Sequence, residues 1–361
     1  MTAIPNRQIR LQFQTPYGFV HQDLSAVRCV NDRFLWLGSD ETAALERLTL
    51  ADKTAAEHHH IPLSDYLDLP NPDDEEVDVE GIAYTDHYLW VVGSHSLKRK
   101  KAKLDISDAD NIDRMAELEQ EDNRYLLARI PHVQGELFKL CSHPDNPDIT
   151  LTAAQIKFKK SGNQLTKALE DDPHLGPFLK ADIPGKDNGF DIEGIAVFPD
   201  ESGEAEDIRI FVGLRGPVLR GWAILLELQV KDDGEGELRL AKIGPDKTRY
   251  RKHFVNLQGL GIRDLCPLGK DLLILAGPTM ELAASVKLFR LENIVQIKDN
   301  ALIQPAEMLD LPYGQGYDKA EGITLLPDGD LLVVYDSPGS DRVDEARTSV
   351  LADVFAINSI S

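Results

Sequence analysis

Residues 78–96, DVEGIAYTDHYLWVVGSHS, carry the pattern that decides the fold. Glu80 opens a short apolar strand, Thr-Asp-His forms a turn, and a second apolar run ends at Gly93. Related stretches read DIEGIAVFPDESGEAEDIRIFVG over residues 191–213, with a longer turn, and AEGITLLPDGDLLVVYDS over residues 320–337. Each stretch is typical of a β-hairpin, and a hairpin that recurs along a chain indicates a repeat architecture.

Two further copies of the hairpin are degenerate. The stretch LSAVRCVNDRFLWLGSD, residues 24–40, places Ser25 where Glu80 stands in the first stretch. The stretch GIRDLCPLGKDLLILAGP, residues 261–278, places Arg263 at that position. The chain therefore contains about five copies of one hairpin.

The repeat predicts an all-β fold, a five-bladed β-propeller formed by residues 1–361 as one domain. Each hairpin would supply the inner strands of a four-stranded sheet. The last sheet lacks a fourth strand after its hairpin, whereas Arg7–Gln14 alternates polar and apolar residues as an extra strand. We expect this N-terminal strand to close the last blade, so that no sheet edge stays open. A six-bladed ring is the alternative, because the interval between Glu80 and Glu193 is about twice the others.

Two helical insertions are predicted in that long interval, at about 104–124 and 151–180. The first follows a basic run, Lys98–Lys103, and contains apolar residues three apart on one face of a helix. The second has helix-like spacing that stops at Pro173 and Pro177. Both are interpreted as additions to the ring rather than as a further blade.

Composition and charge narrow the class of protein. The chain has 361 residues, 42% hydrophobic and 28% charged, with a net charge of −22. This acidity argues against nucleic acid or an anionic membrane as partner, since either requires a positive surface. No apolar run approaches the roughly 18 residues that cross a bilayer. The three cysteines are far apart, which fits reduced thiols and a cytoplasmic location. The oligomeric state is left open.

The equivalent position of each repeat should lie at one mouth of the central channel. These positions are Ser25, Glu80, Glu193, Arg263 (or Asp264, one residue on) and Glu321. Three carboxylates near one axis repel one another unless they protonate, meet arginine or bind a cation. Oxygen ligands suit Ca²⁺ or Mg²⁺, so Glu80, Glu193 and Glu321 are candidate metal ligands. The alternative is that each glutamate accepts hydrogen bonds from the backbone of a neighbouring strand.

Other polar residues near the hairpin ends are candidate ligand-binding groups. Ser94 and His95 are adjacent on one strand, so they cannot face each other as a catalytic dyad. Arg215 and Arg220 lie in a loop, GLRGPVLRGW, that contains glycine and proline. With Arg263 they could bind phosphate or carboxylate, or pair with the ring of glutamates.

The sequence resembles a bacterial family catalogued only as a domain of unknown function. The resemblance rests on EGIA, WVVGSHS, GLRGPVLRGWA, GIRDL, LAGPT and EGIT and covers nearly the whole chain. It implies a propeller without an established activity. The Glu-Gly opening is also distantly similar to esterase-like phytases and to gluconolactonase-type calcium propellers, which implies that Glu80, Glu193 or Glu321 is a calcium ligand. An asparagine and an aspartate that the calcium propellers place in other blades have no clear counterpart here.

Two classes of function follow. The first is a hydrolase, with or without the help of a metal ion, that acts on a small anionic ester, a phosphate or a carboxylate, at the mouth. The second is a non-catalytic propeller that binds a ligand or a protein. Fold does not decide between them, because propellers host both.

Overall fold

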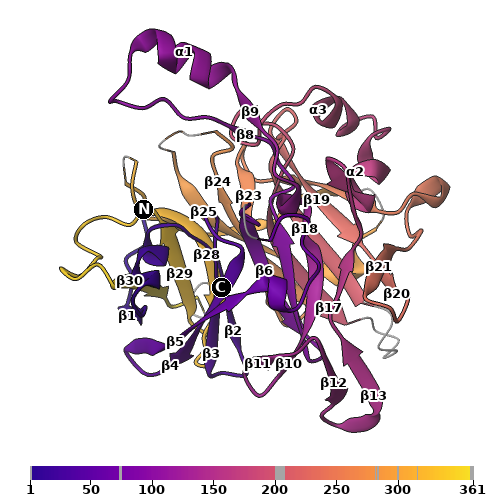
Figure 1. Ribbon diagram of the computed structural model, residues 1–361, viewed down its shortest axis with the longest axis horizontal. Helices are drawn as coiled ribbons and strands as arrows, with labels where there is room; N and C mark the ends of the chain where they lie inside the picture. The colour runs from indigo at the N-terminus through magenta and orange to yellow at the C-terminus, as the bar shows by residue number, and fades with distance from the viewer. Residues whose placement is uncertain are drawn as a thin grey trace.

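The computed structural model describes residues 2–72, 75–199, 208–280, 282, 284–298, 301–314 and 316–357. The predicted long turn at 200–207 lies outside these residues. The chain is all-β, with sheets arranged around a common centre and helices confined to the periphery (Figure 1). Within the described ranges, no helix combines the length and the apolar character needed to cross a membrane.

An inner strand from each repeat lies next to the centre. These strands are β2 (Leu24–Val30), β6 (Val79–Thr85), β17 (Asp191–Pro199), β23 (Gly261–Leu268) and β28 (Lys319–Leu325). Their backbones approach closely: a Cβ added to Gly81 would lie 2.8 Å from the amide nitrogen of Ile195, and one added to Gly194, 2.8 Å from the Cα of Asp264. Glycine is therefore required where β6, β17 and β23 meet.

Hydrogen bonds continue this ring of inner strands. The Ser25 hydroxyl of β2 donates to the Val79 carbonyl of β6. The Asp264 carboxylate of β23 accepts from the Ile323 amide of β28 at 2.8 Å. A Cβ on Gly322 would lie 3.0 Å from the Val27 amide nitrogen, which places β28 beside β2. The inner strands thus follow one another around the centre in chain order and return to the first.

Each inner strand continues outward into a sheet that is antiparallel except at two outer pairs. The first sheet adds β3 (Phe34–Ser39), β4 (Ala44–Leu50) and β5 (Thr54–Pro62). The second adds β7 (Tyr88–Gly93), β10 (Leu127–Val133), β14 (Ala154–Ile156), β21 (Glu237–Leu240) and β20 (Val230–Asp232). The third adds β18 (Ile208–Gly216), β19 (Trp222–Leu228), β22 (Arg251–Asn256) and β26 (Leu302–Ile303). The fourth adds β24 (Asp271–Gly277), β25 (Val286–Leu291) and β27 (Ala306–Leu311). The two parallel pairs are β14–β21 and β22–β26.

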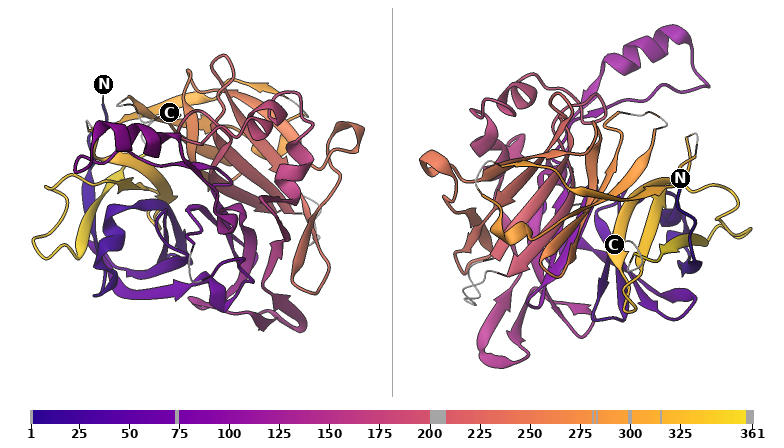
Figure 2. Two further views of the ribbon diagram at one scale, coloured as in Figure 1. Left: turned by 45° about the horizontal axis from the view of Figure 1, so that its top comes forward. Right: turned by 180° about the vertical axis from the view of Figure 1, so that it is seen from behind.

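The last sheet contains both ends of the chain. It runs from β28 through β29 (Leu331–Asp336) and β30 (Ser349–Phe355) to β1 (Arg7–Gln12). β1 is antiparallel to β30 from the Arg7–Val354 pair to the Gln12–Ser349 pair. β1 also pairs in parallel with β5, so the first and last sheets are continuous. The indigo N-terminal strand accordingly lies beside the yellow C-terminal strands (Figure 2).

The core fills the spaces between neighbouring sheets. Leu89 and Val91 of β7 belong to the same apolar cluster as Trp36 of the first sheet. The alternate residue, Trp90, belongs to the cluster that contains Ile195 of the third sheet. Successive side chains of a strand point to opposite faces, so a nearly continuous apolar run is needed where both faces are covered.

The helical segments are shorter than the sequence pattern predicts. The first insertion forms β8 (Lys98–Arg99), α1 (Asp108–Ala116) and β9 (Leu118–Glu119), and the Ser107 side chain caps the helix by accepting from the Asp110 amide. In the second predicted insertion, only α2 (Gln164–Leu169) and α3 (Gly176–Lys180) are α-helical.

Residues 151–163, expected to be helical, instead contain the end of β13 (Asn146–Thr152), then β14, β15 (Phe158–Lys159) and β16 (Gly162–Asn163). The reason lies in burial. Ala154 and Ile156 alternate with a partly exposed Gln155 and pack against the second sheet, which favours a strand. Two further strands, β11 (Glu136–Leu137) and β12 (Leu140–His143), precede this segment.

Candidate functional site

The equivalent positions of the repeat all stand at β-bulges. The pairing of each inner strand with the next strand skips one or two residues at the position predicted to line the mouth. The skipped residues are Ser25, Glu80, Glu193 with Gly194, Arg263 and Glu321. A bulge leaves its residue outside the ladder and re-aims its side chain. In the fourth sheet it is Arg263 that is skipped, while Asp264 stays paired and binds backbone amides.

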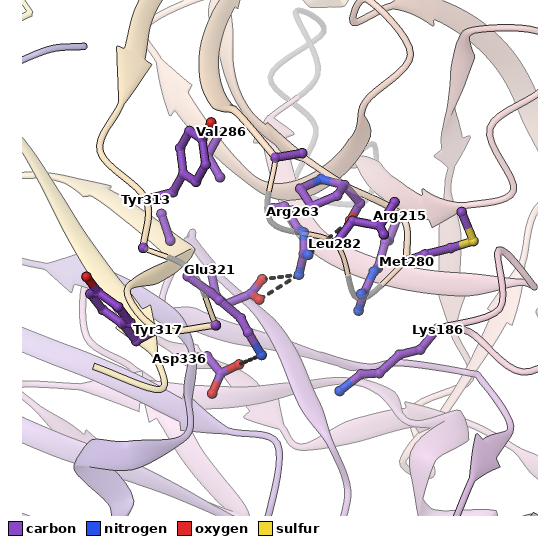
Figure 3. A pocket seen from close by; sticks show the side chains of 16 residues that line it. Lys186, Arg215, Arg263, Met280, Leu282, Val286, Tyr313, Tyr317, Glu321 and Asp336 are labelled. Atoms are coloured by element: carbon purple, nitrogen blue, oxygen red, sulfur yellow. Dashed lines mark hydrogen bonds and ion pairs between the residues drawn. The ribbon is translucent and has the colours of Figure 1, made fainter. Parts of the chain in front are cut away.

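Two of the glutamates meet arginine. Arg263 Nη1 lies 2.6 Å from Glu321 Oε1 and 3.3 Å from Glu193 Oε2, and the Arg263–Glu321 pair is drawn in Figure 3. Arg215 Nη1 donates to the other oxygen of Glu193 at 2.7 Å. The two guanidinium groups also donate to the carbonyls of Pro278 and Thr279, each at 3.0 Å. Both glutamates are therefore held in a buried ion-pair network.

The third glutamate, Glu80, is surrounded by other acidic groups. Within the described part of the chain, its carboxyl group has no hydrogen bond or ion pair, whereas the nearby Asp78 pairs with Arg124. Burial raises the pKa of Glu80 well above its usual value, and the charges of Glu193, Asp78 and Asp191 raise it further. This environment therefore favours the protonated form of the Glu80 carboxyl group.

Other carboxyl groups of this mouth also titrate near neutrality. Burial, then the charge of Glu193, raises the pKa of Asp191 to about 7. Burial raises the pKa of Glu321 to about 7 although Arg263 lies beside it. Burial and Asp78 raise the pKa of Asp40 to about 8. Groups with such pKa values can act as general acids or bases at physiological pH.

Two adjoining cavities open at this mouth and share Lys186 and Arg215. The smaller, about 260 Å³, has an ionic floor formed by the Arg263–Glu321 pair. Its wall is apolar and aromatic, as Figure 3 shows. The wall residues are Pro278, Met280, Leu282, Val286, Tyr313 and Tyr317. A concave apolar wall with a few convergent polar groups is the usual form of a small-molecule site.

The larger cavity, about 490 Å³, lies between acidic hairpin ends and the predicted basic run. Its lining includes the basic residues Lys98, Arg99, Lys100 and Lys101 and the acidic residues Asp40, Asp78, Glu80 and Asp191. The basic run is anchored there, because Lys98 Nζ lies 2.8 Å from Glu76 and Arg99 Nε lies 2.8 Å from Asp187. It is a border of the mouth as well as an exposed surface.

Lys186 is a basic residue that lines both cavities. Its side chain points into the smaller cavity (Figure 3), and among the described residues its ammonium group forms no hydrogen bond and no ion pair. Burial and Arg215 act against its charge, but Asp40, Asp78 and Glu80 outweigh them and raise its pKa. Lys186 is therefore an ammonium group that a bound anion could reach.

Three predicted ligand-binding residues lie outside these cavities. The Ser94 hydroxyl accepts from Arg124 Nε at 3.1 Å and thereby supports the Arg124–Asp78 pair. His95 is buried, and its ring nitrogens contact the Gly93 carbonyl at 2.8 Å and Asn163 Nδ2 at 2.7 Å.

Burial lowers the pKa of His95 to about 4, so it stays neutral at physiological pH. Arg220 is exposed in the loop after β18 and lines neither cavity. The structure thus brings Arg215 and Arg263 together with the glutamates, but not Ser94, His95 or Arg220.

Sequence reasoning missed Asp40, Asp78, Asp191, Arg124 and Lys186. A signal was available for two of them, because Asp78 and Asp191 each precede their glutamate by two residues in the motifs DVEG and DIEG. Lys186 lies in the loop before β17, and Arg124 in a 3₁₀ turn after the first insertion. Neither segment belongs to the repeated hairpin, so no spacing could align them.

The donor set fits a divalent cation only in part. Glu193 and Glu321 already bind guanidinium groups, and Glu80 alone of the three keeps a free carboxyl group in the described structure. Within the described ranges, one cluster of possible metal ligands has its ligand atoms within 4.8 Å of one another. It consists of His87, His143 and Asp145. It does not include the three glutamates.

The architecture is an all-β ring of sheets with cavities at one mouth, as in β-propellers. Residues 23–353 match the family model described as Protein of unknown function (DUF3616), and the chain belongs to that family. No curated protein matches the chain.

Solved structures with a similar arrangement include hydrazine synthase of Kuenenia stuttgartiensis, with 10% identity, 87% of this chain and 56% of that chain covered, and a TM-score of 0.34. The chain therefore spans about half the length of that protein. Glutaminyl cyclase of Myxococcus xanthus has 8% identity, 98% and 99% coverage and a TM-score of 0.40. The PQQ-bound aldose sugar dehydrogenase of Streptomyces coelicolor has 11% identity, 98% and 99% coverage and a TM-score of 0.39. At these scores no activity is carried over.

Proposed function

We propose that the chain is a five-bladed β-propeller whose mouth binds a small organic anion, a phosphate or carboxylate with an apolar or aromatic part. The observation that carries this proposal is the Lys186 ammonium group, which lacks a partner in the described structure and points into a cavity with an apolar wall. The five inner strands and their closed sequence of contacts support the blade count.

The charges of the smaller cavity favour an anion. The described lining holds four basic side chains, Lys186, Arg215, Arg263 and Lys319, and two acidic ones, Glu321 and Asp336. Arg263 pairs with Glu321, and Lys319 Nζ lies 3.2 Å from Asp336. Arg215 pairs with Glu193 below the cavity, so Lys186 remains to bind the anionic group.

The apolar wall favours a ligand with a hydrocarbon or aromatic part. Met280 and Leu282 are 43% and 59% exposed, and Tyr313 and Tyr317 are 45% and 49% exposed. Covering such side chains contributes about 25 cal/mol for each Å² of apolar surface removed from water. An inorganic anion would use Lys186 but would leave this wall exposed to water.

Hydrolysis of an ester bound at this mouth is the more specific possibility. Glu80, whose protonated form burial favours, could donate a proton to a leaving oxygen, while Asp191, with a pKa of about 7, could take one from water. Both residues line the larger cavity, which adjoins the binding cavity at Lys186 and Arg215. Without such turnover, the same site would serve a sensor or an adaptor.

The Lys186→Met variant should bind phenyl phosphate and benzoate at least about tenfold more weakly than the wild type, because a hydrogen bond to a charged group contributes about 1.5–3 kcal/mol. Its melting temperature should hardly change. Calorimetric titration measures the affinity. The matched control is Lys242→Met, which removes an exposed lysine outside both cavities.

Equal affinity of wild type and Lys186→Met would overturn the proposal. Equal affinity for inorganic phosphate and phenyl phosphate would show that the apolar wall plays no part. Release of phenol that is lost in Glu80→Gln would support a hydrolase, and binding without release would support a sensor or adaptor.

A divalent cation at the acidic side of the mouth is our second proposal. Glu80 is buried among other acidic groups, whose negative charges repel one another. Ca²⁺ or Mg²⁺ would relieve this repulsion. Because Glu193 and Glu321 are held by arginine, Glu80 would be the first of the three predicted ligands to bind.

Calcium should raise the melting temperature of the wild type but not that of Glu80→Gln. At about 100 times the dissociation constant, the ion would stabilise the fold by roughly 2.7 kcal/mol. The effect should grow with pH, since the ion competes with the proton that the raised pKa of Glu80 retains. Scanning calorimetry with and without EDTA measures it. If Ca²⁺, Mg²⁺ and Mn²⁺ do not change the melting temperature of the wild type, no cation binds there, and the arginine pairs alone offset the charge of the glutamates.

A further inference from the structure

Three metal-ligating side chains lie at the end of the second sheet that is remote from the mouth. His87 occupies the turn between β6 and β7, whereas Glu80 lies near the opposite end of β6. His143 and Asp145 lie at the turn of the β12–β13 hairpin, and Figure 1 shows this hairpin far from α1. Segments separated by more than 50 residues thus bring two imidazoles and a carboxylate together.

The geometry of this trio suits an ion. One ligand atom from each of His87, His143 and Asp145 lies within 4.8 Å of the other two. His87 Nε2 is 3.1 Å from Asp145 Oδ2. Bonds of about 2.0–2.1 Å in a tetrahedral zinc site place neighbouring ligand atoms about 3.3 Å apart. The observed separation is therefore close to that of a preformed site.

The backbone holds these residues in place. Asp86 and His87 both have left-handed backbone angles, φ 51° and 62°, as a tight hairpin turn requires. The His87 carbonyl accepts from the His132 amide at 2.7 Å, which fixes the turn against β10. His143 Nδ1 lies 3.1 Å from the Asp145 amide nitrogen, so the two residues share one tight turn, and an ion would take the place of this amide on the ring nitrogen.

The ligand types indicate which ion would bind. Imidazole suits zinc, cobalt, nickel and copper, whereas Ca²⁺ and Mg²⁺ prefer oxygen ligands. Three protein ligands leave a fourth position for water. His143 also lines a cavity of about 500 Å³ together with Asp86 and Arg129, which gives solvent a route to that position.

Few of the described side chains in the β12–β13 hairpin are buried. Most residues of β13 are exposed, and Leu151 is the buried side chain near its base. An ion bound by His87 from the sheet and by His143 and Asp145 from the hairpin would cross-link the two. Such a link would restrain the exposed end of the hairpin, whose base already packs against the core through Leu151 and Cys141.

We propose that His87, His143 and Asp145 form a site for a Zn²⁺-type transition-metal ion that ties the β12–β13 hairpin to the second sheet. This site is separate from the mouth and does not depend on the proposed ligand. Its role is structural: it restrains the hairpin, and the open position holds water.

Titration of the untagged full-length protein with Co²⁺ tests the proposal. We expect one equivalent to bind, with visible absorption bands of a low-coordinate cobalt site, and Zn²⁺ to displace it. His87→Ala should lower the affinity by at least about tenfold, since even changes around a metal ligand cost 10–100-fold. Asp145→Asn, which keeps the shape of the side chain, should weaken binding too.

The matched control is His59→Ala, an exposed histidine on β5 beside two other histidines. Zn²⁺ should slow proteolysis within residues 140–152 in the wild type and in His59→Ala, but not in His87→Ala. Equal binding by wild type and His87→Ala would overturn the site. A larger loss in His59→Ala than in His87→Ala would assign the ion to the three consecutive histidines instead.

Discussion

Deletion of residues 1–14 should abolish cooperative unfolding of the entire chain. β1 lies between β30 and β5, and its removal would open two sheet edges at once. Ile9, Leu11 and Phe13 are buried, and burial of each contributes about 1.5–3 kcal/mol. Their sum is comparable with the 5–15 kcal/mol that stabilises a typical domain. Thermal melting followed by circular dichroism measures the loss.

Deletion of residues 1–5 is the matched control, because it removes the segment before β1 and leaves the strand intact. This shorter deletion should melt nearly as the wild type does. A synthetic peptide of residues 5–14, added in excess, should restore a cooperative transition to the longer deletion. If the longer deletion melts like the full chain, the N-terminal strand does not close the ring.

Arg263→Gln should destabilise the fold by about 3–5 kcal/mol, the cost of leaving a buried charge without its partner. The change would leave Glu321 without its guanidinium partner and remove one of two from Glu193, and both glutamates lie inside the ring. Urea unfolding followed by tryptophan fluorescence measures the difference. Because the glutamates can protonate instead, the loss should be smaller at pH 5 than at pH 8.

Arg239→Gln is the control for this substitution. Arg239 pairs with Asp233 and Glu237 on the surface, and its side chain is 60% exposed, so its loss should cost no more than about 1 kcal/mol. The double variant Arg263→Gln with Glu321→Gln should recover part of the stability, because it removes charge and countercharge together. Equal costs for Arg263→Gln and Arg239→Gln would mean that the buried network contributes little.

The repeat in the sequence predicts much of the ring of strands. It predicts little of how the buried carboxylates of the ring are neutralised. Spacing alone identified Glu80, Glu193 and Glu321 as equivalent, and all three stand at bulges. It could not choose between Arg263 and Asp264, since one residue of register separates them. The choice depends on the bulge, which is a property of strand pairing rather than of local sequence.

The non-repeating segments explain the residues that sequence reasoning missed or misplaced. Ser94 and His95 follow a repeated strand and were expected to face a ligand. Arg124 and Asn163, from outside the repeat, occupy their polar atoms instead. Lys186 also lies outside the repeat. Such contacts depend on where the insertions lie against the ring, and the repeat pattern does not predict their positions.

The pairing of β1 with β30 has a consequence for synthesis on the ribosome. β1 is synthesised long before its partner β30, and at 5–20 residues per second the delay between them is on the order of tens of seconds. During that time Ile9, Leu11 and Phe13 have no partner strand from the C-terminal end, and the nascent ring cannot close. A chaperone that shields β1 until β30 has been synthesised would then raise the yield of native protein.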